Sequence, residues 1–248
     1  MFVIAFSIGW FLTKNIFKNE GKPDDRLDSL FIYVVVATLV GARLGHVFFY
    51  QPELLKDDFF SVFLPFSFKN GFQFTGFRGL ASHGAAIGII TAMYFYSKKV
   101  LKKPILWILD RIVIAVASGA VFVRIGNFIN SEIIGTATNS DFGVVFTQLG
   151  EDFPRHPAQL YESFCYVFVF AILYYLYWKT DKRNQMGYLL GTFLVLLWTV
   201  RFFVEFVKEA QVDNRAEWIL NTGQWLSIPF ILMGIYLMSS SSKRPVND

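Results

Sequence analysis

The 248 residues are too apolar and too weakly charged for an ordinary soluble domain. Hydrophobic residues make up 54% of the chain and charged residues 17%, whereas a soluble domain carries about 25% charged residues. The net charge of +4 does not indicate nucleic-acid binding, because the basic residues cluster in short connections between apolar segments. Cys165 is the only cysteine, which excludes an intrachain disulfide and a cysteine-based zinc site.

Seven apolar segments predict an all-α, polytopic integral membrane protein. A helix needs about 20 apolar residues to cross a bilayer, and most of the segments approach or exceed that length. The first is shorter, so we expect either a tilted, incomplete helix or a helix whose first turns are truncated. The whole chain, residues 1–248, is interpreted as one transmembrane domain. The predicted spans are residues 2–12, 30–50, 80–96, 105–125, 157–178, 187–207 and 218–238.

The connections between these spans differ in character. Residues 14–28 are predicted to form a mixed-charge loop. Residues 51–78 are aromatic and amphipathic, so they suit the membrane interface better than its interior. Residues 127–157 form the most polar stretch and end at Pro157, a residue well placed to start the next helix.

Lysine and arginine are unevenly shared between alternate connections. Residues 11–30, 97–104, 178–187 and the C-terminal tail carry 13 of them, whereas the other connections carry 8 although they are longer in total. The positive-inside rule places the richer set in the cytoplasm. Seven spans then put the N-terminus outside and the C-terminus inside, and the polar helix ends gather at the outer face.

The densest polar chemistry lies in Arg124-Ile-Gly-Asn-Phe-Ile-Asn-Ser-Glu-Ile-Ile-Gly135, directly after an apolar run. An arginine at the bilayer centre costs roughly 2.5–3.5 kcal/mol on insertion scales. Arg124 and Asn127 are three residues apart, so they would share a helix face. The stretch is either a polar helix end that caps itself or part of a site. Similar clusters at other helix ends on the same side favour a site.

Two further groups could contribute chemistry. His83, at the head of a span, is either an interfacial residue or a candidate base. Arg201 and Glu205 are spaced i, i+4. They form either an intrahelical ion pair, in which the arginine-first order is the weaker one, or part of a site. Arginine grips phosphate through a planar fork, so converging arginines indicate an anionic lipid headgroup. His83 and the carboxylates add proton acceptors, which an enzyme would need.

Six blocks of the chain resemble prolipoprotein diacylglyceryl transferases, and they run in the order of that family across nearly the whole sequence. The block from Arg124 to Gly135 is the most specific. The others are Gly41-Ala-Arg-Leu-Gly45, Gly79-Leu-Ala-Ser-His-Gly84, Arg155-His-Pro-Ala-Gln-Leu-Tyr-Glu162, Arg201-Phe-Phe-Val-Glu205 and Gly223-Gln-Trp-Leu-Ser-Ile-Pro229.

The resemblance implies a seven-helix enzyme of the bacterial cytoplasmic (inner) membrane, with its active site toward the outer, periplasmic face. Such an enzyme transfers the diacylglyceryl group of phosphatidylglycerol to the lipobox cysteine thiol of a preprolipoprotein signal peptide and releases glycerol phosphate. The implied partners are phosphatidylglycerol, preprolipoproteins and membrane lipid, without nucleic acid, cofactor or metal. The competing interpretations are a purely structural membrane protein and a lipid or anion transporter, for which charges at midplane depth are typical.

The resemblance also assigns roles to individual residues. Expected catalytic residues are His83, Glu132, Arg201 and Glu205. Expected ligands of phosphatidylglycerol are Arg124, Asn127, Asn130 and Gly135. Supporting roles are expected for Arg43, Arg155, His156 and Glu162. A thiol with a pKa near 8.5 is mostly protonated at neutral pH, so the reaction needs a base, and His83 is the candidate.

Two positions depart from the family pattern. The family usually carries a functional tyrosine upstream of the position of Phe2, and Leu197 stands where a tyrosine is common. The interpretation is that the start of the chain is assigned too far downstream.

Overall fold

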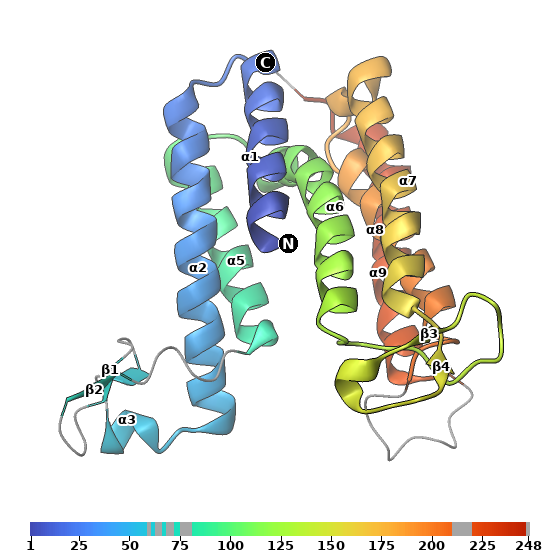
Figure 1. Ribbon diagram of the computed structural model, residues 1–248. Helices are drawn as coiled ribbons and strands as arrows, with labels where there is room; N and C mark the ends of the chain where they lie inside the picture. Colours follow the sequence, from blue (N-terminus) through green and yellow to red (C-terminus); the bar gives the residue numbers. More distant parts are fainter. Residues whose placement is uncertain (59–60, 63–65, 68–71, 75–80, 210–219, 247–248) are drawn as a thin grey trace. The chain divides into compact units, whose positions relative to one another are not determined.

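The computed structural model describes residues 1–58, 61–62, 66–67, 72–74, 81–209 and 220–246, apart from the side chains at positions 57, 67, 82 and 83. The chain forms two compact units (Figure 1). Unit 1 comprises residues 1–16 and 109–248, and unit 2 comprises residues 17–108. Each unit is considered by itself below.

Seven long helices dominate the described part of the chain. They are α1 (Phe2–Asn19), α2 (Asp24–Tyr50), α5 (Ser82–Tyr96), α6 (Ile105–Ile129), α7 (Ala158–Lys179), α8 (Tyr188–Val204) and α9 (Thr222–Ser240). The shorter helical elements are α3 (Leu54–Asp57), a π-helical turn at Ser97–Leu101, and 3₁₀ turns at Thr147–Leu149, Asp181–Asn184 and Ser241–Lys243. Two antiparallel strand pairs complete the elements: β1 (Phe66–Ser67) with β2 (Gln73–Phe74), and β3 (Val144–Val145) with β4 (Pro154–Arg155).

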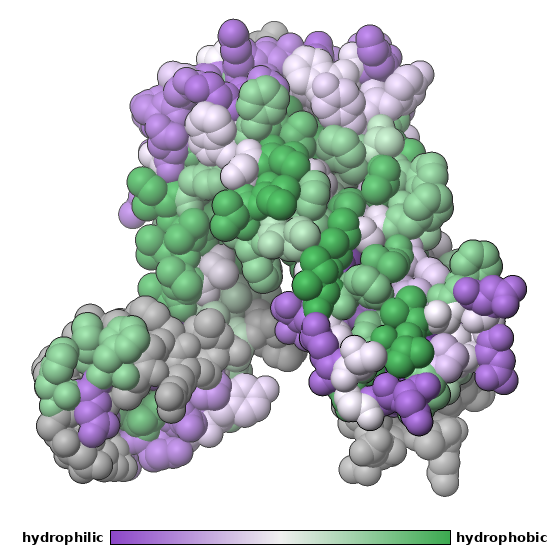
Figure 2. All heavy atoms as spheres, viewed as in Figure 1, coloured by the Kyte–Doolittle hydropathy of each residue, from purple (hydrophilic) through white to green (hydrophobic). Residues whose placement is uncertain are grey.

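The predicted all-α membrane fold is confirmed. By length and composition, α2, α6, α7 and the helical stretch Thr222–Lys243 could each cross a membrane, and α8 is a shorter apolar helix. In each unit, hydrophobic side chains cover the helix flanks and hydrophilic ones gather toward the helix ends (Figure 2). Large apolar residues such as Phe164 on α7 and Tyr236 on α9 are exposed, as expected for surfaces that face lipid. Seven spans remain a prediction.

The predicted loop at residues 14–28 is wrong over most of its length. Helix α1 continues to Asn19, and α2 begins at Asp24. The charges suit these helix ends, because Lys18 lies in the last turn of α1 while Asp24 and Asp25 lie in the first turn of α2. The prediction from apolar content alone therefore underestimated the lengths of both helices.

In unit 2, α2 and α5 pack through glycines at backbone contact. A Cβ atom added at Gly45 would lie 2.6 Å from the Cα atom of Gly84, and one added at Gly84 would collide with the carbonyl oxygen of Gly41. Small residues at such contacts are typical of membrane helix pairs, where close packing replaces the hydrophobic effect. In unit 1, α8 and α9 pack closely in the same way around Gly191 and Gly234.

A buried aspartate organises the start of α8 in unit 1. The carboxylate of Asp110, on α6, accepts hydrogen bonds from the backbone N–H groups of Gly187 at 2.6 Å and Leu190 at 2.8 Å. These donors belong to a helix N-terminus, where amides lack intrahelical partners. The side chain is fully buried, so Asp110 supplies at a distance the cap that α8 lacks locally. Sequence reasoning missed it.

Gly84→Val should loosen the α2–α5 pair, because the new side chain has to displace backbone atoms. We expect the free energy of unfolding to fall by about 1–3 kcal/mol, the usual cost of overpacking. Thermal unfolding in detergent measures the change. Gly119→Ala is the control, since the nearest atom to its added Cβ lies 3.9 Å away. Equal melting temperatures for both variants would contradict this account of the contact.

Candidate active site

The frame of the site in unit 1 is built from three chain segments joined by backbone hydrogen bonds. Residues 134–138 lie in the middle. On one side, the N–H of Gly135 donates to the carbonyl of His156 and the N–H of His156 donates to the carbonyl of Thr136, both at 3.0 Å. On the other side, the N–H of Thr136 donates to the carbonyl of Val207 at 2.9 Å. The frame therefore joins the stretches that follow α6, precede α7 and follow α8.

Gly135 occupies the tightest point of this frame. A Cβ atom there would lie 2.7 Å from the carbonyl oxygen of Val207 and would also collide with His156. Its carbonyl accepts a hydrogen bond from Nη1 of Arg155 at 3.2 Å. Both backbone groups of Gly135 are thus used within the protein, so its contacts indicate that it holds the frame together.

Helix α6 ends in a Schellman motif that presents the polar residues of the 124–135 stretch. The N–H of Glu132 donates to the carbonyl of Asn127 at 2.8 Å, and the N–H of Ser131 donates to the carbonyl of Phe128 at 3.1 Å. Ser131 and Ile133 have φ values of 55° and 56°, a left-handed conformation that costs most residues roughly 1–2 kcal/mol. Glu132 is therefore held between two strained residues.

Side chains from this helix end form one hydrogen-bonded cluster. Nη1 of Arg124 donates to Oδ1 of Asn127 at 3.4 Å, which confirms that these residues share a helix face. Nδ2 of Asn127 donates to Oε2 of Glu132 at 2.8 Å, and Nδ2 of Asn130 donates to Oε1 at 3.4 Å. A cavity of about 240 Å³ adjoins the cluster, and its lining is Met1, Phe2, Val123, Gly126, Asn127, Ile129, Asn130 and Glu132.

Arg124 begins a row of four alternating charges, which continues with Glu162, Lys208 and Glu205. Nε of Arg124 lies 2.7 Å from Oε2 of Glu162, on α7. The other oxygen of Glu162 accepts a hydrogen bond from Nζ of Lys208 at 2.9 Å, and Nζ lies 3.5 Å from Oε2 of Glu205. Glu162 is fully buried. Sequence reasoning gave Glu162 only a supporting role and missed Lys208, although Lys208 lies three residues after Glu205.

Arg201 and Glu205 are close in sequence but have different partners. The guanidinium of Arg201 lies over the ring of Trp198, 4.9 Å from its centroid. Its Nε atom is buried and has no hydrogen-bond partner among the residues that the structure describes. Among the described residues, Glu205 forms its ion pair with Lys208, and the predicted intrahelical ion pair between Glu205 and Arg201 is not found. Arg201 thus keeps donor capacity for a ligand.

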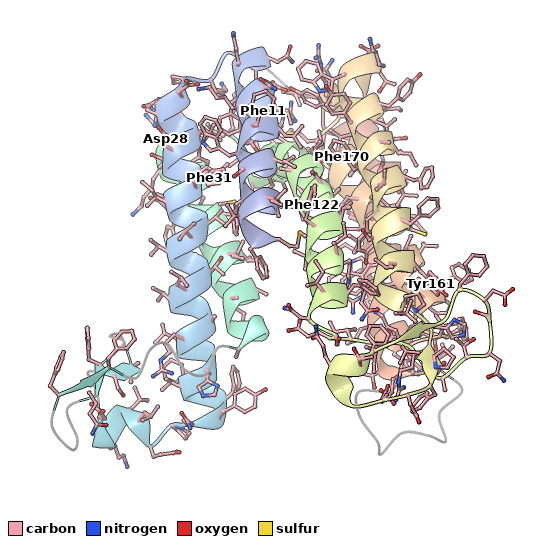
Figure 3. All side chains as sticks on the ribbon, viewed as in Figure 1. Phe11, Asp28, Phe31, Phe122, Tyr161 and Phe170 are labelled. Atoms are coloured by element: carbon pink, nitrogen blue, oxygen red, sulfur yellow. The ribbon has the colours of Figure 1, made fainter. Side chains whose placement is uncertain are left out.

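Arg155 ties the loop that carries β3 and β4 to the frame. It donates to both carboxylate oxygens of Glu151 at 2.6 Å and to Glu209 at 3.1 Å. These hydrogen bonds hold the pKa of Glu151 below its ordinary value and raise the pKa of Arg155. His156 contacts the hydroxyl of Tyr161 through Nδ1 at 3.3 Å, close to the start of α7 (Figure 3). The contacts of Arg155 and His156 are with other residues of the protein, which fits the supporting roles expected for them.

Two of the predicted residues belong to unit 2. Arg43 is buried, and it donates to the carbonyls of Val62 at 3.2 Å and Ser61 at 2.6 Å. These bonds attach the connection after α3 to α2, as a supporting role requires. His83 lies in the first turn of α5, but its side chain falls outside what the structure describes. The other ten predicted residues all belong to unit 1.

A family model described as prolipoprotein diacylglyceryl transferase matches residues 1–240. The chain belongs to this family. Relatives named phosphatidylglycerol–prolipoprotein diacylglyceryl transferase include one from Chloroherpeton thalassium, 41% identical over 98% of this chain and 87% of its own length. Those from Tolumonas auensis and Bacteroides fragilis are 39% and 38% identical over 98% of this chain, and cover 90% and 88% of their own lengths. The resemblance drawn from the six blocks is confirmed.

Proposed function

We propose that the protein transfers the diacylglyceryl group from phosphatidylglycerol to the cysteine thiol of prolipoproteins. The observation that carries the proposal is the polar cluster around Arg124, where a guanidinium is braced by Glu162 and Asn127 at the end of an apolar helix. Such an arrangement suits a phosphate at the headgroup layer of a membrane. Membership of the transferase family supports the same reaction.

The proposed reaction builds negative charge on the departing phosphate. The thiol sulfur attacks the glyceryl carbon, an S–C bond forms, and the C–O bond to phosphate breaks, so that a phosphodiester leaves as a monoester. Arg124 and Arg201 would stabilise this charge, strongly so in a partly dehydrated site. Asn127, Asn130 and Glu132, which line the adjoining cavity, would bind the polar headgroup.

A base has to take the thiol proton. We assign that role to His83, with Glu205 as the next candidate because it lies one turn from Arg201.

A transporter is the weaker proposal. Its ionisable residues should lie along a path through the membrane. Here Arg124 lies in the last two turns of α6, Glu162 in the first two turns of α7, and Arg201 in the last turn of α8. Charges at helix ends suit a reaction at one membrane face.

The deciding experiment is complementation of a bacterial strain depleted of its own transferase. The chain, with and without an upstream extension, should restore growth and lipoprotein modification. Normal membrane levels without modification in either form would refute the proposed function.

Arg124→Lys should still fail in a transfer assay with purified enzyme, because an ammonium supplies charge without the planar fork. We expect kcat/KM for phosphatidylglycerol to fall about tenfold to a hundredfold, as for a lost charge-assisted hydrogen bond worth about 1.5–3 kcal/mol. Arg183→Lys, in the 3₁₀ turn that follows α7, is the control. Near-normal activity of Arg124→Lys would mean that charge alone binds the phosphate.

His83→Gln should lower the transfer rate about a hundredfold at neutral pH, within the usual range for loss of a general base. Part of the rate should return as the pH approaches 8.5, because the substrate thiol then ionises by itself. The measurement is a pH–rate profile beside that of the unaltered enzyme. A normal rate at pH 7 would transfer the base role to the glutamates.

We also propose that the N-terminus lies outside and the C-terminus inside the cytoplasmic membrane, with the site at the outer face. The support is the excess of lysine and arginine in one set of connections. Reporter fusions at residues 97–104 and 138–142 should report opposite compartments. Both fusions on one side would overturn the orientation.

A further inference from the structure

Lys208 is a buried cation between two carboxylates. Its side chain is 5% exposed, and its backbone is fixed by a bridge to Gly135 in the frame of the site. Nζ lies 2.9 Å from Oε1 of Glu162 and 3.5 Å from Oε2 of Glu205. A buried ammonium is costly unless it is paired, so these two carboxylates define where Lys208 can sit.

Lys208 also limits how Glu162 can hold Arg124. A carboxylate can grip a guanidinium with both oxygens, which forms two parallel hydrogen bonds. Here the closest approach between the two side chains joins Oε2 of Glu162 to Nε of Arg124, whereas Oε1 accepts a hydrogen bond from Lys208. Lys208 therefore competes with Arg124 for the charge of Glu162. The terminal nitrogen Nη1 of Arg124 makes a long 3.4 Å contact with Asn127, and the guanidinium also donates a hydrogen bond to the side chain of Tyr166.

We infer that Lys208 is a positioning residue for phosphatidylglycerol binding, an inference that rests on the proposed function. By holding one oxygen of Glu162 and sharing its charge, Lys208 weakens the attraction of Glu162 for Arg124 and so disfavours a two-pronged pair. The guanidinium of Arg124 can then turn its terminal nitrogens to the lipid phosphate. Lys208 acts through Glu162 and Arg124, without touching the reacting atoms.

This role makes a prediction that a simple stabilising contact does not. Without the ammonium, the buried charge of Glu162 has Arg124 as its remaining partner in the row and should capture it. Neutralising Glu162 as well removes the competitor, so a second substitution should restore binding that the first one lost. A contact that only supports the fold predicts the same loss or a greater one in the double variant.

The test uses purified full-length protein in detergent, titrated with phosphatidylglycerol, with lipid-dependent thermal stabilisation as the measure of Kd. The variants are Lys208→Met, Lys208→Arg and Lys208→Met combined with Glu162→Gln. Lys179→Met is the matched control, since Lys179 is exposed at the opposite end of α7. Transfer to a lipobox peptide is measured separately as kcat and KM.

We expect Lys208→Met to raise Kd and KM for phosphatidylglycerol about tenfold or more, the scale of one charge-assisted hydrogen bond. Lys208→Arg keeps the charge and should bind more tightly than Lys208→Met. The double variant should recover much of the lost affinity. An unchanged Kd in Lys208→Met, or a double variant that binds no better than Lys208→Met, would overturn the inference.

The outcomes remain separable if a variant is unstable or the chemistry fails. If Lys208→Met does not accumulate, the double variant is compared with Glu162→Gln alone, which retains Lys208. The Kd of the double variant for phosphatidylglycerol should then be no more than about threefold higher, since non-coupled sites add to within about 0.5 kcal/mol. Weaker binding overturns the inference. Unaltered protein that binds the lipid but transfers nothing refutes the proposed function alone. Unaltered protein that binds no phosphatidylglycerol refutes both.

Discussion

The carboxylate of Glu162 is the interaction on which the site of unit 1 depends. It is fully buried and holds Arg124 with one oxygen and Lys208 with the other. Removing one member of a buried ion pair typically costs about 3–5 kcal/mol, yet replacing the whole group by apolar residues is often neutral. The row of charges is therefore weak evidence for stability. Its value lies in fixing side chains from α6, α7 and the stretch after α8 relative to one another.

The sequence predicted the residues of this site better than the pairing between their side chains. The clusters at residues 124–135, 155–162 and 201–205 were recognised because polar residues at the ends of apolar helices are unusual. The spacing of Lys208 from Glu205 could have indicated their ion pair. The other pairings of Lys208 and Asp110 escaped notice because the partners lie far away in sequence: Glu162 is 46 residues before Lys208, and Gly187 is 77 residues after Asp110. No helical or strand periodicity encodes such pairings.

Helix ends were the other source of error, for an electrostatic reason. The extents of α1 and α2 were underestimated because lysines and aspartates were taken as signs of a loop. In the fold they complement the partial charges of the helix termini. At α6, the helix end does cap itself, and in doing so it presents Asn127 and Glu132 together; that the 124–135 stretch is part of a site stays a prediction.

The glycine contact between α2 and α5 has a mechanical consequence. Two helices that touch backbone to backbone cannot slide past each other without separating, because the carbonyl oxygen of Gly41 and the Cα atom of Gly45 lie against Gly84. Residue 83 directly precedes Gly84 on α5, so its backbone is held by this contact. The α2–α5 pair should therefore move as one body, so that a displacement of α2 also displaces the start of α5.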